Sequence, residues 1–288
     1  MTAPASPPKA RIRPAVPGDF DGVYPLLRLL NDTRLTRDVW QRLFDPLWRG
    51  ADYCPGYVLV DGSTAVGFIG TLYSERMVNG AVQRFCNLTS WVVLPEYRSQ
   101  SVMMLLPILR DKSVTLTSLT SSEEAYAIYQ KLGFKDLDTC ARVMYRLPGV
   151  RSSSYQVLRG GRCADALSAD QAALYRDHQR LDIEHCLVRK GSGQCYLMLE
   201  SKRGRAHVHH ISDTAWFRDH VGRFRHGLLA TLGLNTLQVD ERFVSGVRVV
   251  ASRRKVFDQP KQFRSRALAV NDIDALYSEL LVLATSSD

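Results

Sequence analysis

The chain has 288 residues, of which 45% are hydrophobic and 23% are charged, with a formal net charge of +9 at pH 7. This is ordinary globular composition, with enough length for one large or two small domains. No apolar run approaches the length of a transmembrane helix, and residues 1–9 lack the apolar core of a signal peptide. We therefore expect a cytoplasmic protein that begins with a disordered lead-in at 1–9.

The positive charge is concentrated in the second half of the chain. Residues 151–288 hold 21 basic and 15 acidic side chains, against 17 and 14 in residues 1–150. A basic protein can bind nucleic acid, an anionic membrane or a polyanionic small molecule, and charge alone does not choose among them.

The six cysteines form no CxxC pair, and several lie in apolar runs. This pattern favours reduced, buried thiols over disulfides or a zinc site.

Residues 10–148 are predicted to form a complete α/β domain. Alternating polarity indicates strands, apolar residues at helical spacing indicate helices, and Asp61-Gly62 predicts a hairpin turn. In chain order we expect a strand at 10–16, a helix capped by 17–19, a helix at 35–47, hairpin strands at 57–60 and 65–72, strands at 82–93 and 114–119, a helix carrying Tyr129, and a strand at 141–145.

A linker rich in Pro, Gly and Ser separates this domain from residues 155–288. There we expect a helix at 166–186, paired strands at 195–200 and 206–211, a helix at 214–232, a strand at 234–239 and a terminal helix at 272–283. Hairpin, helix and strand repeat the later part of the first domain. We therefore expect a second, degenerate copy of the first domain.

The stretch from Asn87 to Leu106 is the most informative part of the sequence. It has the pattern of a buried strand, a short basic turn and the start of an apolar helix. The first backbone N–H groups of a helix have no partner within it and carry partial positive charge. Such a turn is suited to bind a pyrophosphate.

A second motif, from Ala125 to Phe134, is a helix that ends at Gly133 before a strand. Together the two motifs resemble the acetyl-CoA-binding core of the GNAT superfamily of N-acetyltransferases. The resemblance implies an α/β (α+β) fold for residues 10–148, with a mixed, mostly antiparallel central sheet flanked by helices, followed by the second GNAT-like unit.

The resemblance also implies that acetyl-CoA or another acyl-CoA binds as co-substrate. In this family the pantetheine arm fills a gap between two splayed strands, where Trp91, Val92 and Val93 would contact it. The phosphate turn would consist of Arg98, Ser99, Gln100, Ser101, Val102 and Met103. Ser101 and Met103 replace the small residues of the family pattern, and Met103 would crowd the pyrophosphate.

By the same resemblance Tyr129 is the general acid that protonates the departing thiolate. Ser122 stands where the family often has Asn, and it is expected, together with Tyr129, to contact the cofactor. Tyr126 offers a rival hydroxyl. The usual strand glutamate is missing, so Glu75 is the carboxylate candidate for a general base. Asn87 or Thr89 would instead relay a proton through water, and a neutral amine would need no base.

Two further clusters have an ordinary structural interpretation. His207 and His209 share one face of a strand, but no third metal ligand lies nearby in the sequence. The basic side chains of the second half are expected in solvated turns, or in contact with an anionic acceptor: Arg203, Arg205, Arg253, Arg254 and Lys255.

The function expected from the sequence is acyl-CoA-dependent N-acyltransfer to an amine of a small molecule, a sugar or a protein, with a saccharide hydroxyl as the alternative acceptor. The second unit would shape the acceptor cleft or form the surface of a homodimer. The alternative is a noncatalytic acyl-CoA-binding or partner-binding protein. Nucleic-acid binding through the arginine-rich second half is a third hypothesis, and it predicts an affinity that falls steeply with salt.

Overall fold

The computed structural model describes residues 10–284, apart from 33, 46–47, 49–52 and 151–153. The expected lead-in at 1–9 lies outside the described residues. The chain divides into two compact units. Unit 1 comprises residues 1–135, 262–269 and 277–283, and unit 2 comprises residues 136–261, 270–276 and 284–288.

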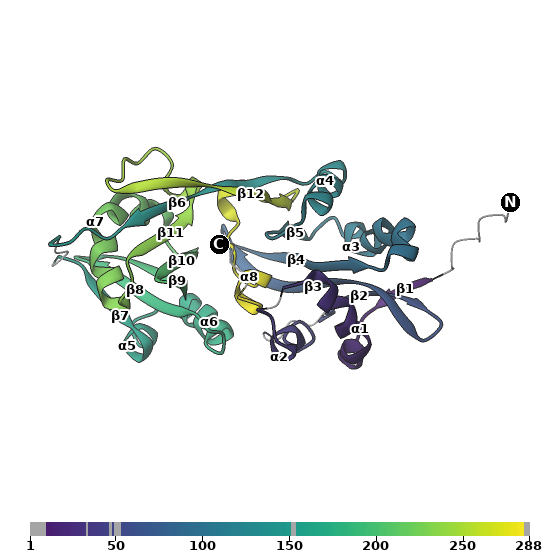
Figure 1. Cartoon of the computed structure of the whole chain (residues 1–288). Coiled ribbons are helices and arrows are strands. Elements are labelled where there is room, and N and C mark those ends of the chain that lie inside the picture. The colour runs from purple at the N-terminus through teal and green to yellow at the C-terminus, as the bar shows by residue number, and fades with distance from the viewer. Residues whose placement is uncertain (1–9, 33, 46–47, 49–52, 151–153, 285–288) are drawn as a thin grey trace. The chain divides into compact units, whose positions relative to one another are not determined.

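Unit 1 is an α/β unit built on one mixed sheet (Figure 1). Its elements are β1 (Arg11–Pro14), η1 (Pro17–Asp19), α1 (Phe20–Leu27), η2 (Arg28–Leu30), α2 (Arg37–Gln41), β2 (Gly56–Asp61), β3 (Thr64–Val78), β4 (Ala81–Val93), η3 (Pro95–Leu105), α3 (Leu106–Arg110), β5 (Thr115–Ser118), α4 (Glu123–Lys131) and α8 (Glu279–Val282). The strand order is β1-β2-β3-β4-β5, followed by the end of β12 (Ser252–Arg264). Neighbours are antiparallel except for the parallel pair β4–β5.

Aromatic packing holds the helices of unit 1 to the sheet. The ring of Phe44 lies 5.3 Å from that of Phe20 on α1 and 5.4 Å from that of Phe68 on β3. Val282 and Leu283, near the end of the chain, are buried in the same cluster. The C-terminal segment is therefore part of the core of unit 1, which fixes the position of the residues just before it.

Unit 2 is a second α/β unit with its own core. Its elements are β6 (Lys135–Tyr145), β7 (Gln156–Arg159), α5 (Gly160–Ala164), α6 (Ala169–His178), β8 (Glu184–Lys190), β9 (Gly193–Lys202), β10 (Arg205–Ile211), α7 (Thr214–Leu232), β11 (Thr236–Asp240), η4 (Glu241–Val244), most of β12, and η5 (Val270–Asp272). The strand order is β12-β6-β11-β10-β9-β8-β7. The apolar stripe of α7, including Phe217, Val221 and Phe224, packs into this core.

The division into units follows strand pairing, and unit 1 takes a strand from the second half of the sequence. In unit 1, Gln262–Arg264 of β12 pair with β5. In unit 2, β6 pairs with β11, although its sequence directly follows α4 of unit 1. The division therefore differs from the expected boundaries at 10–148 and 155–288, because strand pairing rather than the Pro/Gly/Ser linker decides where β6 and the end of β12 belong.

Four sequence predictions of secondary structure were wrong in part. The helix expected at 166–186 ends at His178, and Glu184–Lys190 is a strand because β7 and β9 pair with it on both edges. Arg253, Arg254 and Lys255 lie in β12 rather than in turns. The helix at 35–47 is α-helical only over Arg37–Gln41, and the terminal helix only over Glu279–Val282.

All six cysteines are unpaired, and all but Cys54 are buried. Among the described residues no helix is long and apolar enough to cross a membrane.

Candidate active site

Strands β4 and β5 pair over only three residues, and β5 ends one residue after the ladder, at Ser118. The parallel ladder runs from Phe85↔Thr115 to Asn87↔Thr117, whereas β4 continues to Val93 along β3. In the described part of the chain, residues 88–93 have no ladder partner on the β5 side. This edge, here called the split, therefore offers backbone groups to a ligand that binds as an added strand.

A β-bulge lies within the split. The pairing of β3 with β4 shifts from Phe68↔Val92 to Gly70↔Thr89, so that one residue of β3 faces Ser90 and Trp91 together. Ser90 has φ 52°, a left-handed conformation that a bulge requires. Gly70 makes room for it, because a Cβ at this position would lie 2.9 Å from Cγ2 of Thr89.

The bulge is followed by an aromatic stack on Tyr129. The ring centres of Trp91 and Tyr129 are 5.7 Å apart and the rings are nearly parallel. The ring centre of Phe134 lies 4.9 Å from that of Tyr129. Tyr129 is only 2% exposed. Nε1 of Trp91 is buried with no hydrogen-bond partner among the described residues.

Burial and the nearby Glu279 carboxylate raise the pKa of Tyr129, while a hydrogen bond with Ser118 acts in the opposite direction. The phenol therefore keeps its proton at neutral pH, as a proton donor must. Tyr126, the rival hydroxyl, accepts a hydrogen bond from Nε2 of Gln130 at 2.7 Å.

Glu279 is the site residue that the sequence analysis missed. Its backbone N–H donates to Oδ1 of Asn87 at 3.0 Å, and its Oε1 accepts from Oγ1 of Thr120 at 2.8 Å and from the N–H of Leu119 at 3.3 Å. Nδ2 of Asn87 in turn donates to Oγ1 of Thr117 at 3.2 Å. Glu279 thus joins β4 to the chain just after β5, at the point where the two strands part.

Burial raises the pKa of the Glu279 carboxyl, and the hydrogen bonds with Thr120, Asn87 and Leu119 partly offset this effect. The only sequence signal was a single acidic residue within the apolar run Ser278–Leu283. Its position 160 residues after Leu119 gave no indication that the two meet.

Glu75 does not lie at the split. It stands opposite Arg84 in the β3–β4 ladder, with a side chain that is 61% exposed and 3.9 Å from Nε of Arg84. Arg84 precedes Trp91 by seven positions in the sequence, which is roughly 20 Å along a strand. The structure therefore brings Tyr129 together with Glu279 and not with Glu75.

The expected helix start at 98–103 has a different form. Residues Pro95–Leu105 are a 3₁₀ helix, and the α-helix begins only at Leu106, with Pro107 in its first turn. Proline lacks the N–H that a helix interior needs, so an α-helix cannot start near Arg98 and run through position 107 without disruption. The amides of 98–103 therefore lie inside a 3₁₀ helix rather than at the N-terminus of an α-helix.

The side chains of this 3₁₀ helix point mostly to solvent. Arg98 and Ser99 are exposed, Gln100 and Ser101 are half-buried, and the apolar Val102 and Met103 are 41% and 52% exposed. Ser122, which was expected to contact the cofactor, caps α4: its hydroxyl accepts from the N–H of Ala125.

Unit 2 contains a comparable split that the chain itself covers. Strands β10 and β11 are parallel only from Arg205↔Thr236 to His207↔Gln238. Beyond this point the N–H of Ala275 donates to the carbonyl of His209 at 3.3 Å, and Nδ1 of His210 lies 2.9 Å from Oδ2 of Asp274. This edge of unit 2 is therefore already bonded at His209.

The histidines of β10 do not form a metal site. His207 and His209 are buried, and burial lowers the pKa of His207 to about 3. Within the described ranges no group of three or more His, Cys, Asp or Glu side chains is arranged to hold a metal ion.

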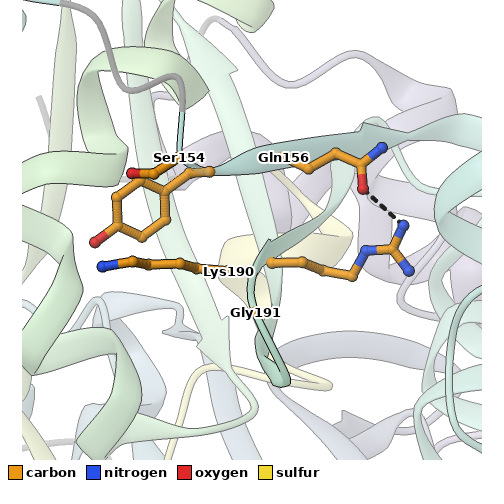
Figure 2. Close-up of a pocket in the computed structure, with 6 residues that line it drawn as sticks. Ser154, Gln156, Lys190 and Gly191 are labelled. Atoms are coloured by element: carbon orange, nitrogen blue, oxygen red, sulfur yellow. Dashed lines mark hydrogen bonds between the residues drawn. The ribbon is translucent and has the colours of Figure 1, made fainter.

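A separate pocket of about 550 Å³ lies at the β7–β8 edge of unit 2 (Figure 2). Nη2 of Arg189 donates to Oε1 of Gln156 at 2.8 Å, and Nζ of Lys190 lies 5.2 Å from the ring centre of Tyr155. The pocket contains none of the predicted site residues.

Comparison with solved structures identifies the fold. No family model matches the sequence, and no curated protein matches it. Solved structures match over most of the chain. A GCN5-related N-acetyltransferase from Anabaena variabilis has a TM-score of 0.59 at 8% identity, over 89% of this chain and 72% of that one. A GCN5-related N-acetyltransferase from Kribbella flavida has a TM-score of 0.58 at 16% identity, also over 89% and 72%.

Eis1 from Mycobacterium abscessus is similar over 89% of this chain and 73% of that one, with a TM-score of 0.52 at 12% identity. These likenesses confirm the predicted fold class, a mixed, mostly antiparallel sheet flanked by helices.

Proposed function

We propose, from the premise that this chain has the GNAT N-acetyltransferase fold, that it is an acyl-CoA-dependent N-acyltransferase whose active site is the split in unit 1. One observation carries the proposal. The β4–β5 ladder ends at Asn87↔Thr117, and a protonated, buried tyrosine lies where the strands part. An open strand edge next to a proton donor suits a thioester held in extended form.

The acyl-CoA would bind along the edge formed by Trp91, Val92 and Val93. Their main-chain groups have no β5 partner in the described part of β4, and the unpartnered indole N–H of Trp91 is a further donor for a pantetheine carbonyl. The phosphates would lie against the 3₁₀ helix, where Arg98, Ser99, Gln100, Ser101, Val102 and Met103 follow. Because these amides lie within a helix, the exposed side chain of Arg98 would supply most of the attraction.

In the reaction, the amine nitrogen attacks the thioester carbonyl carbon and a tetrahedral oxyanion forms. Its collapse breaks the C–S bond, and the departing sulfur needs a proton. Tyr129 would supply it, since the phenol is held protonated by burial and by the neighbouring carboxylate. We propose an acetyl group as the acyl unit, and an amine of a small molecule, a sugar or a protein as acceptor.

A specific observation favours a second candidate, a noncatalytic acyl-CoA-binding or partner-binding protein. The ring of Trp91 covers Tyr129, and the 3₁₀ helix replaces the usual phosphate-binding helix start. Both features would weaken turnover more than they would weaken contact with a partner.

Two measurements separate these functions. Isothermal calorimetry with acetyl-CoA tests donor binding, and release of free thiol in the presence of a panel of amines then tests turnover. We expect binding together with amine-dependent thiol release. Binding without release supports the noncatalytic candidate, and the lack of binding to any acyl-CoA contradicts both.

A further inference from the structure

The C-terminal segment delivers a buried carboxylate to the split of unit 1. Residues 277–283 belong to unit 1, and Glu279 is 1% exposed there. Nη1 of Arg42 also bonds the carbonyl of Val282 at 3.4 Å, and Val282 is buried in the core. The position of Glu279 is thus fixed from both sides, by the core and by its own hydrogen bonds to Asn87, Leu119 and Thr120.

Thr120 connects this buried carboxylate with solvent. Its hydroxyl donates to Oε1 of Glu279 at 2.8 Å, while the residue itself is exposed. A hydroxyl that donates to a carboxylate still has oxygen lone pairs with which to accept a proton from outside. The hydroxyl of an exposed residue, bonded to a buried carboxylate, therefore forms a two-residue path for a proton.

We propose that Thr120 and Glu279 form the proton relay that deprotonates the acceptor amine. The inference rests on the proposed function and adds the base that the sequence did not reveal. The acceptor it fits is an alkylamine, which is protonated at neutral pH and must lose a proton before it can attack. The hydroxyl of Thr120 takes this proton as its own passes to Oε1 of Glu279.

The proton balance of the whole reaction then closes. The ammonium loses one proton through Thr120 to Glu279, and the neutral nitrogen forms a C–N bond with the thioester carbonyl carbon. The C–S bond breaks as Tyr129 protonates the sulfur, and the phenolate regains a proton from the nitrogen of the tetrahedral intermediate. Glu279 returns its proton to solvent through Thr120. The products are the amide, the free thiol of CoA and one released proton.

The surroundings of Glu279 suit a proton acceptor. The buried phenol of Tyr129 on α4 lies close enough for the Glu279 carboxylate to raise its pKa, and the buried Cys86 of β4 also acts on Tyr129. Burial favours the neutral carboxyl, whereas the bonds from Thr120 and the Leu119 amide favour the carboxylate. A carboxylate balanced in this way accepts a proton more readily than an exposed one.

The test compares acceptors that differ in basicity. Thr120→Val and Glu279→Gln each remove one part of the relay while keeping the size of the side chain. For an alkylamine at pH 7 we expect kcat/KM to fall about 10²-fold in each variant, and no further in the double variant, because the two residues act as a unit. For an aromatic amine or a hydrazide, which is already neutral, we expect all three variants to stay within about threefold of the wild type.

Controls keep the result interpretable. Thr64→Val and Glu124→Gln alter an exposed threonine and an exposed glutamate of unit 1 and should leave both rates unchanged. Calorimetry should give an unchanged affinity for acetyl-CoA in every variant. If Glu279→Gln fails to fold, Thr120→Val still tests the relay, and Thr120→Ser should restore activity.

A loss of equal size for both kinds of amine would overturn the relay, since it would reveal a purely structural role. Full alkylamine activity in Thr120→Val would do so as well. A wild-type protein that turns over no amine at all contradicts the proposed function itself, and this is seen before any variant is made.

Discussion

The indole of Trp91 lies flat against the phenol of Tyr129, with ring centres 5.7 Å apart and planes inclined by 27°. One ring comes from the bulged strand β4 and the other from helix α4, so the stack spans the opening between β4 and β5. A thioester that reaches Tyr129 must change this contact. The stack is therefore a built-in reporter of donor binding.

Acyl-CoA should change the tryptophan fluorescence of the protein. We expect a shift in emission that saturates with acetyl-CoA, because the environment of Trp91 changes when the ring leaves Tyr129. The Trp91→Phe variant should lose the shift, whereas Trp216→Phe, which alters a tryptophan in the core of unit 2, should retain it. A shift that persists in Trp91→Phe would place the binding elsewhere.

Replacing Tyr129 by Phe removes the proposed proton donor and keeps the ring that packs on Trp91 and Phe134. We expect kcat to fall about 10²-fold, in the range typical of a lost general acid, with little change in the affinity for acetyl-CoA. Steady-state thiol release and calorimetry measure the two effects. Tyr126→Phe is the matched control on the same helix, and a larger loss in that variant would reverse the assignment.

The bulge at Ser90 depends on the missing side chain of Gly70. In Gly70→Ala the new Cβ would lie 2.9 Å from Cγ2 and 3.2 Å from the carbonyl oxygen of Thr89. We expect the free energy of unfolding to fall by about 1–3 kcal/mol, as for other overpacked positions, together with weaker acyl-CoA binding. Gly18→Ala, where no heavy atom lies within 4 Å of the new Cβ, is the control. Equal stability of the two variants would contradict this account.

Buried histidines should make unit 2 sensitive to acid. Burial lowers the pKa of His178 and His185 to about 4 and that of His207 to about 3. Each is neutral when folded and titrates near 6.5 when unfolded, so the unfolded chain binds more protons between these values. The stability that comes from keeping these histidines neutral is fully present above about pH 6.5 and is lost as the pH falls toward 4, by ~3 kcal/mol for each histidine.

A buried carboxyl of unit 2 acts in the opposite direction. Burial and the neighbouring Asp240 raise the pKa of Asp138, against the effect of Arg242, so the folded state binds a proton there more readily than the unfolded state. Burial also raises the pKa of Glu279 in unit 1, and these two carboxyls offset only part of the effect of the three histidines. Urea unfolding at pH 7, 6 and 5 should show falling midpoints, with a shallower fall in His207→Gln. Urea midpoints that do not change with pH would contradict the claim that these histidines are neutral in the folded protein.

The sequence predicted well what depends on local patterns. The hairpin at Asp61-Gly62, the long α7 with its apolar stripe and the helix that ends at Gly133 all follow from spacing and turn chemistry, and the structure has each of them. The fold class was implied by the resemblance of the motifs at 87–106 and 125–134 to the GNAT superfamily. Local patterns also predicted that Tyr129 lies on a helix, close to the strand proposed to bind acyl-CoA.

What the sequence could not predict depends on contacts between distant segments. Glu279 is in an unremarkable apolar run, and only pairing with Asn87 and Thr120 gives it a place at the split. The adjacent charges of Arg253, Arg254 and Lys255 predict a basic turn, whereas pairing within the sheet makes these residues part of β12. The 3₁₀ form of 95–105 follows from Pro107, which delays the start of the α-helix to Leu106.

The pairing of the end of β12 with β5 has a consequence for how the chain folds during synthesis. A ribosome releases residues 1–135 long before it reaches Gln262–Arg264, which pair with β5, or Tyr277–Leu283, which complete the core. The first-synthesised half must wait with an open sheet edge until the last residues emerge, whereas unit 2 can assemble almost entirely beforehand. Cutting the gene at the Pro/Gly/Ser linker would therefore yield an N-terminal fragment that lacks both its edge strand and its carboxylate.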